Sequence, residues 1–440
     1  MDAAAFFVGC ISVIAILRKR GKARIDREST KQASKTNRGS IKCQKHRIFE
    51  EVTSTILKKA IAFKGTYSKV GPRQPQVRLV NKELMTKGSR DKLVYHLAFS
   101  FVGDWPSYQA GASLAVWPKN DPQIVDELLD LLAIRRDQLV LEEGSTLCTV
   151  KSWLVNHADL FGAAPRSFYE KLALHAESRY ERLKLAHTGT DDKLEYKVRR
   201  KEGTSAIDIL RQYKSIKIRA AQLLEIIPRN KHRLYSISSS SLVSPSEVHL
   251  LVSVVRWTTP TGRLRFGQCS TYLASLDVGD AIRAEVRKST MKLPRDPSRP
   301  IVMAGLGTGL APFRAFALER MFLRQQGEKV GPTALYFGAR HRASEYLYQK
   351  DIERLAEDGT ITHLRLAFSR DQESKIYIQH IMDKEGTVLR QLICDQVGSF
   401  YLCGPTWPVP DVKKALENSL VPETTISKLK AQERYQLEVY

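Results

Sequence analysis

The sequence predicts an α+β multidomain protein, in which an antiparallel β-barrel with a helical insertion precedes a doubly wound α/β domain. Strand-like segments between residues 77 and 117 return between residues 233 and 255. Between them, from Asp121 to about Pro228, apolar residues recur at helical spacing. From Ile301 onward, apolar strands alternate with helical stretches, which is typical of a parallel sheet with helices on both faces.

The local pattern supports each part of this prediction. Leu93–Phe101 and Tyr108–Trp117 are strand-like, and the second segment ends at a proline. Pro122 stands near the start of the first predicted helix of the insertion. The predicted domains are a membrane anchor with its basic flank at 1–24, a basic linker at 25–75, the barrel at 76–296 with its insertion at 121–228, and the α/β domain at 297–440.

The charge of the chain is unevenly distributed. The 440 residues carry a net charge of +23, and residues 18–73 alone hold 17 Lys and Arg against 4 Asp and Glu. Such a basic arm can bind nucleic acid, but it has few aromatic side chains for base stacking. Beside an apolar segment it more often marks the cytoplasmic side of a membrane. We therefore expect no nucleic-acid partner.

An apolar run at the N-terminus precedes this basic arm. Ala3–Leu17 carries no charge, and five Lys and Arg follow between Arg18 and Arg24. This order of charges predicts a short anchor that leaves the body in the cytosol, at the endoplasmic reticulum or the outer membrane of an organelle. Fifteen helical residues span about 22 Å, which suits a thin membrane. The alternatives are a targeting presequence, with a mitochondrial location, or a buried helix.

The six cysteines form no CxxC pair and no metal-ligand spacing with histidine. We expect reduced thiols and no metal site.

Two basic or glycine-rich motifs in the α/β region are suited to phosphate groups. Gly305-Leu-Gly-Thr-Gly309 follows an apolar strand and leads into a helix, where glycines let a diphosphate approach the backbone. No Gly-Lys-Ser/Thr follows, which disfavours a nucleoside-triphosphate loop, and a turn without a ligand stays possible. Ser369-Arg370, with Lys375 and Tyr377 behind it, offers the cations and hydroxyls that bind a phosphate monoester. We interpret Asp371 as a helix cap.

Four further motifs lie outside these two. Arg233-Leu-Tyr-Ser236 precedes the small-residue turn Gly267–Leu273, which opens a helix and could hold a second diphosphate with Arg233 as its counter-charge. Cys403-Gly404-Pro405 ends the last apolar strand, and Arg434–Tyr440 forms the tail. Each motif alone is compatible with a plain strand, a capped helix or a frayed end.

In this order, the six motifs resemble the ferredoxin–NADP reductase module of diflavin reductases. That family includes the microsomal NADPH–cytochrome reductase and the flavoprotein subunit of sulfite reductase. The resemblance covers residues 77–440, and the Cys403–Pro410 run and the terminal tyrosine are closer to the sulfite reductase branch. It implies an enzyme that binds FAD, takes a hydride from NADPH and passes electrons to a separate flavodoxin-like or haem protein.

The resemblance also implies a role for each matching residue. It assigns the flavin to Arg233, Tyr235 and Ser236, and the FAD diphosphate to Gly267, Cys269 and Ser270. It assigns the NADPH diphosphate to Gly307, Thr308 and Arg340, and the 2′-phosphate to Ser369, Arg370, Lys375 and Tyr377 with Gln379 nearby. Ser236, Cys403 and Glu438 would surround the hydride transfer, while Tyr440 would cover the second flavin face and step aside for the nicotinamide.

The chain departs from the family at three points. Gly111-Ala112 stands where the family usually has Gly-Asp, and Glu438 replaces the commoner aspartate. The segment before Val77 is too short and too basic for the FMN-binding domain of diflavin reductases. We therefore expect one flavin in this chain, and we expect the retained insertion, which orients the FMN domain in the family, to dock the acceptor.

Two alternatives remain after this resemblance. A membrane-tethered, non-catalytic scaffold would require decayed cofactor sites, whereas the Ser369 to Tyr377 motif and the tail are intact. Within the enzymes, the apolar N-terminal run favours a reductase of a haem or FMN protein, and the tail favours a sulfite reductase component.

Overall fold

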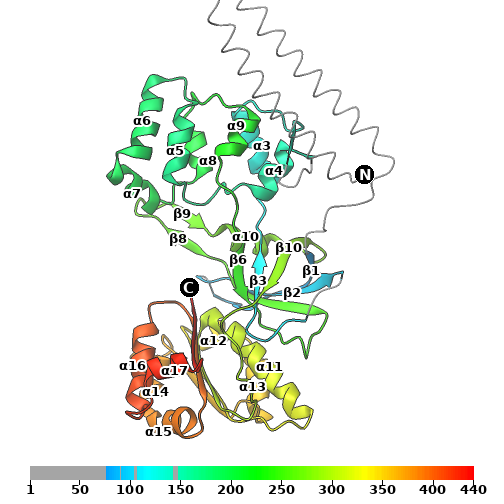
Figure 1. Cartoon of the computed structure of the whole chain (residues 1–440), viewed down its shortest axis with the longest axis vertical. Helices are drawn as coiled ribbons and strands as arrows, with labels where there is room; N and C mark the ends of the chain where they lie inside the picture. Colours follow the sequence, from blue (N-terminus) through cyan, green and yellow to red (C-terminus); the bar gives the residue numbers. More distant parts are fainter. Residues whose placement is uncertain (1–75, 90, 104–106, 142–146) are drawn as a thin grey trace, which may run out of the picture. The chain divides into compact units, whose positions relative to one another are not determined.

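The computed structural model describes residues 76–89, 91–103, 107–141 and 147–440 (Figure 1). The predicted anchor at 1–24 and linker at 25–75 lie outside these residues. Across the described ranges, no helix has both the length and the apolar character needed to span a bilayer.

An antiparallel sheet forms the first part of the described chain. Its strands, in the order β6-β3-β10-β1-β2-β7, are β6 (Arg233–Ser236), β3 (Ser113–Val116), β10 (Ala281–Arg287), β1 (Gln76–Leu84), β2 (Val94–Val102) and β7 (Glu247–Ser253). Alternate residues such as Val77, Leu79 and Phe99 are fully buried in one core. The edge strands meet at a bridge between Ile237 and Leu250. This bridge supports closure into a barrel, which stays a prediction.

The predicted strand at Tyr108–Trp117 is too long. The strand β3 covers only Ser113–Val116. Gly111 just before it has a φ of +92°, and a Cβ there would lie 2.1 Å from the carbonyl oxygen of Met291. The chain therefore turns at this glycine, in a conformation that a side chain would strain, and becomes extended only after it.

The insertion between β3 and β6 is helical, apart from one hairpin. Its helices are α3 (Pro122–Leu131), α4 (Val150–His157), α5 (Arg166–Ala173), α6 (Arg179–Thr190), α7 (Lys193–Lys201), α8 (Ala206–Gln212) and α9 (Ala220–Ile226), and its hairpin is β4 (Leu139–Leu141) with β5 (Leu147–Thr149). Asp121 caps α3 by accepting the Gln123 N–H, as expected for a carboxylate before a proline. Buried Trp153, Phe168 and Tyr169 lie in its core.

A hairpin and a helix connect β7 to β10 of the antiparallel sheet. The hairpin of β8 (Arg256–Thr258) and β9 (Leu264–Phe266) leads into α10 (Gln268–Ser275). The prediction that Gly267–Leu273 opens a helix is thus confirmed.

The second sheet is parallel, as predicted. Its order is β13-β12-β11-β14-β15, with β13 (His363–Phe368), β12 (Thr333–Ala339), β11 (Ile301–Leu306), β14 (Ser399–Gly404) and β15 (Tyr435–Val439). Around it lie η2 (Gly307–Leu310), α11 (Ala311–Gln325), α12 (Arg342–Glu345), α13 (Gln349–Glu357), α14 (Ile378–Lys384), α15 (Gly386–Arg390), η3 (Gln391–Asp395), α16 (Val409–Ser419) and α17 (Ile426–Ala431). Odd and even residues of β11 belong to different cores, one shared with α11 and α13 and the other with α14 and α16.

A buried polar network connects the two sheets. Tyr348, at the start of α13, shares hydrogen bonds with His96 Nδ1 at 2.8 Å and with Ser238 Oγ at 3.1 Å. Arg314 on α11 donates to the carbonyl of Ser238 at 2.8 Å and pairs with Asp351 at 2.7 Å. Burial, with the neighbouring His249 and Arg314, lowers the pKa of His96 to about 3.

The low pKa of His96 predicts that the free energy of unfolding decreases as the pH falls below 6.5. The ordinary pKa of histidine is 6.5, so between pH 6.5 and 3 the unfolded chain binds the proton that folded His96 excludes. The free energy of unfolding is therefore unaffected by protonation of His96 above pH 6.5 and falls as the pH decreases toward 3. At pH 5 the loss is about 2 kcal/mol. Thermal unfolding of His96→Gln should therefore depend less on pH between 7.5 and 5 than that of the parent. The exposed His187→Gln should match the parent, and an equal slope in all three would contradict the assignment.

Candidate functional site

Three side chains that the sequence predicts around hydride transfer lie together. Ser236, at the end of β6, donates a hydrogen bond of 2.5 Å to Glu438 Oε1, and Ser289 donates one of 3.3 Å to Glu438 Oε2. Cys403 and Glu438 are direct partners in the β14–β15 register. The cluster therefore joins the antiparallel sheet to the parallel one through a single carboxylate.

The Cys403 thiol in this cluster is buried. Burial raises its pKa above the ordinary range, and the neighbouring Glu438 raises it further. The thiol therefore stays protonated at neutral pH and can act only as a weak donor.

The chain terminus folds back onto this cluster. The hydroxyl groups of Tyr440 and Thr308 lie 2.6 Å apart, and the Tyr440 N–H donates to the Gly404 carbonyl. Tyr440 as a whole residue is 63% exposed. Gly309 packs against the same strand end, since a Cβ there would lie 2.0 Å from the Cys403 carbonyl oxygen.

The predicted FAD residues surround the start of α10. Gly267 is its N-cap and supplies no side-chain cap, so the first amides of the helix can bind an anion. Ser270 is buried, and its hydroxyl accepts from Val255 N–H and donates to the Gly267 carbonyl, so this hydroxyl shapes the turn. Tyr235 is half-buried, and burial together with the adjacent Cys269 raises its pKa. Arg233 is exposed on the same strand.

The glycine turn after β11 forms a positively charged cradle. Gly307 has a φ of +57°, and a Cβ there would lie 3.1 Å from Lys92 Nζ. Glu345 lies 3.9 Å from Lys92 and pairs with Arg340 at 2.6 Å. Burial lowers the pKa of Lys92, with Glu345 opposing that effect. A partly exposed glycine backbone beside Lys92, whose partner Glu345 also pairs with Arg340, fits a diphosphate.

Lys92 is a candidate site residue that the sequence analysis missed. It stands in the turn between β1 and β2, far along the chain from Gly307, and no local motif marks it. Ser289 was missed for the same reason.

The predicted 2′-phosphate residues follow β13. Ser369 is buried, whereas Arg370 and Lys375 are exposed, and the Arg370 N–H donates to the Arg340 carbonyl at 2.8 Å. Tyr377 is the N-cap of α14 and lies 6.3 Å from the exposed ring of Trp407, while Gln379 is buried in α14. Exposed cations beside a tyrosine fit a phosphate on a nucleoside.

The N-cap position of α12 belongs to His341 and that of α14 to Tyr377, so the predicted cap Asp371 contacts the start of α12 only from a distant segment. The Asp371 carboxylate accepts the N–H of Arg342, the first residue of α12, at 2.7 Å, and it lies 3.0 Å from His341 Nδ1. These contacts lower its pKa, the Arg342 N–H contributing most. The carboxylate is therefore engaged in the protein.

Comparison with known proteins agrees with this geometry. Residues 72–272 match the family model described as an FAD binding domain, and residues 303–414 match that of an oxidoreductase NAD-binding domain. The chain is thus a two-domain flavoprotein, with FAD and NADPH as its cofactors.

Three longer proteins are similar to this chain over most of its length. The chain is 37% identical over 411 residues to the sulfite reductase [NADPH] flavoprotein component of Saccharomyces cerevisiae, covering 87% of this chain and 39% of the relative. It is 32% identical over 390 residues to the NADPH–cytochrome P450 reductase of Drosophila melanogaster, covering 82% and 57%. A mitochondrial pyruvate dehydrogenase [NADP(+)] of Euglena gracilis is 34% identical over 322 residues, covering 71% and 18%.

These findings show that the chain belongs to the diflavin reductase family, a family of NADPH-dependent FAD oxidoreductases, and carries its ferredoxin–NADP reductase-like module. It spans less than two thirds of the length of each of these three relatives.

The packing around Gly309 gives a direct prediction. Gly309→Ala places a methyl group against the Cys403 carbonyl, so the end of β14 must shift, at a cost of about 2 kcal/mol or more in unfolding free energy. Urea unfolding measures this loss. Gly386→Ala, where a Cβ comes no closer than 3.3 Å to any neighbour, is the control and should stay within about 0.5 kcal/mol. Equal stability of both variants would contradict the close packing.

Proposed function

We propose that this chain is an FAD-containing reductase that takes a hydride from NADPH and passes the electrons to a separate acceptor protein, flavodoxin-like or haem-containing. The contact between Ser236 and Glu438 carries this proposal, because it joins the FAD-binding and NAD-binding domains at one polar cluster. FAD, when bound, would supply the two-electron chemistry that the amino acids lack.

The protein's own side chains orient the two cofactors. Glu438, held by Ser236 and Ser289, would stabilise the positive charge that develops on the nicotinamide as the hydride leaves. The Tyr440 hydroxyl contacts Thr308, and in the family resemblance this tyrosine covers the flavin and would step aside for the nicotinamide when NADPH binds. Arg233 would balance the FAD diphosphate at α10.

The preference for NADPH over NADH would come from Arg370 and Lys375. Both are exposed, and within the described ranges no carboxylate lies within salt-bridge distance of either. Their charges are therefore available to a 2′-phosphate.

A reductase-like scaffold without activity receives no support from these sites, whose predicted charged residues are in place. The names of the relatives leave both a haem protein of the cytochrome P450 type and a sulfite reductase partner open as acceptor. We infer membrane attachment, with the body in the cytosol, only from the sequence of residues 3–24.

Anaerobic spectroscopy of the full chain tests the proposed function. The protein loaded with FAD should be bleached by NADPH much faster than by NADH. Failure to bind FAD, or no bleaching by NADPH, would overturn the reductase assignment.

Ser236→Ala should slow this bleaching by roughly 10- to 100-fold, because Glu438 loses its shortest hydrogen bond. The dissociation constant of NADPH should change little, which stopped-flow absorbance at several NADPH concentrations can establish. Ser289→Ala, with the longer contact, should have a smaller effect. Equal rates in Ser236→Ala and the parent would contradict the role of the cluster.

Arg370→Ala should raise the KM for NADPH by about 10- to 100-fold, since a charge-assisted hydrogen bond to phosphate is lost. The KM for NADH should stay unchanged, because that coenzyme lacks the 2′-phosphate. Steady-state kinetics with both coenzymes give the comparison, and Lys350→Ala on the exposed side of α13 is the control. A parallel loss with both coenzymes would argue against phosphate recognition.

A further inference from the structure

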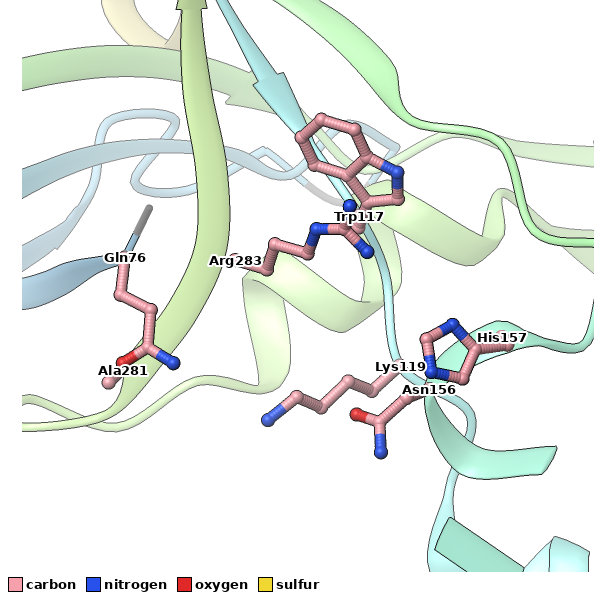
Figure 2. A pocket seen from close by; sticks show the side chains of 7 residues that line it. All are labelled: Gln76, Trp117, Lys119, Asn156, His157, Ala281 and Arg283. Carbon is pink, nitrogen blue, oxygen red and sulfur yellow. The ribbon is translucent and has the colours of Figure 1, made fainter. Parts of the chain in front are cut away.

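A polar pocket of about 230 Å³ lies between the antiparallel sheet and helix α4 of the insertion. Its described lining residues are Gln76, Trp117, Lys119, Asn156, His157, Ala281 and Arg283, none of them acidic. Figure 2 shows Lys119 extending from the insertion side toward the β10 strand that carries Arg283. We refer to this hollow as the Trp117 pocket.

The positive charge in the Trp117 pocket is not neutralised by the described residues. The Arg283 guanidinium lies 4.4 Å from the centre of the Trp117 ring, and its buried Nε has no hydrogen-bond partner. Lys119 is exposed, and among the described residues no carboxylate lies within salt-bridge distance of either cation. A planar cation over an aromatic ring, with an unused N–H, is suited to a carboxylate.

The pocket lies on the same face of the sheet as Ser236. Ser113 is the directly paired residue of Ser236 in the neighbouring strand. Every second residue of a strand lies on the same face, so Ser113, Ala115 and Trp117 share the face of Ser236. Four residues of extended chain measure about 13 Å. The pocket is therefore one short strand away from the cluster at which the hydride would be transferred.

We propose that the Trp117 pocket is the docking point of an acidic electron-acceptor protein, which inserts a carboxylate side chain between Lys119 and Arg283. This inference rests on the proposed function and names the partner's charge and place of contact. Each NADPH oxidised to NADP⁺ yields two electrons and one proton, so two one-electron acceptors dock in turn, or one two-electron acceptor docks once.

The construction of the pocket favours a protein carboxylate over a free nucleotide phosphate. The proposed NADPH cradle includes the glycine turn at Gly307, whereas no glycine is among the described residues that line the Trp117 pocket. Asn156 and Gln76 add neutral amides that can bind the backbone of an inserted loop. Docking here would bring the acceptor close to Ser236, as electron transfer between proteins requires.

Charge variants and three acceptors test the proposal on the full chain. Lys119→Glu and Arg283→Gln alter the pocket, Lys119→Arg conserves its charge, and Lys350→Glu makes the same charge change on the exposed side of α13. The acceptors are flavodoxin, an acidic FMN protein, cytochrome c, a basic haem protein, and ferricyanide, a small ion. Flavin bleaching by NADPH is measured in parallel for every variant.

We expect Lys119→Glu and Arg283→Gln to slow flavodoxin reduction about tenfold at low salt and to weaken its dependence on ionic strength. Lys119→Arg, Lys350→Glu, the bleaching rate, and the reduction of cytochrome c and ferricyanide should stay within about twofold of the parent. A similar loss in Lys350→Glu, unchanged flavodoxin reduction in both pocket variants, or no flavodoxin reduction by a parent that still bleaches would overturn the docking site alone. Loss of bleaching in the parent would instead overturn the proposed function.

Discussion

The parallel pairing of β15 with β14 fixes the position of the polar cluster. Arg434, just before β15, is buried, and its side chain donates to the carbonyls of Gly398 at 2.9 Å and of Ile393. The Arg434 carbonyl accepts the N–H of Phe400 in β14. These bonds allow only one alignment of β15 with β14, in which Cys403 is paired with Glu438. A slip of one residue would turn Glu438 to the opposite face of the sheet, away from Ser236. The tail is therefore held by backbone bonds at both ends, at Arg434 and at Tyr440.

Ser236 is held from a second side by the buried network around Tyr348. Ser238, two residues further along, binds both the Tyr348 hydroxyl and, through its carbonyl, Arg314. Tyr348 has a φ of 53°, a strained conformation for a bulky residue, and the Arg314 guanidinium lies 4.5 Å from its ring centre. Such strain persists only where the surrounding contacts over-determine it. The network thus sets how β6 approaches β15, and the distance between Ser236 and Glu438 follows from it.

Sequence predicted the elements whose signal is local. Ile301–Ala304 is a continuous apolar run before glycines, as a strand buried on both faces must be, and Gly267 before a small-residue helix is a local signal too. Sequence does not predict the edge strand β15, because Tyr435–Val439 mixes polar and apolar residues, and the strand pairs on one side only. Lys92 and Ser289 could not be found, since each reaches the site through folding of distant segments. The Trp117 pocket combines four separate stretches of chain, and its charge imbalance appears only once they meet.

Two positively charged regions in this chain differ in the chemistry that they can hold. At the carboxyl ends of β11, β12 and β13, where nucleotides bind in open parallel sheets, the backbone of Gly307 lies beside Lys92, and Arg340 pairs with Glu345, the residue that also contacts Lys92. Along β3 of the other sheet, a tryptophan carries an arginine and no glycine turn is present in the lining. The Ser236 cluster lies between these regions, reached from one through β14 and from the other along β3. If the acceptor docks at the Trp117 pocket as proposed, the coenzyme and the acceptor would use separate regions, so electrons could leave without prior release of NADP⁺.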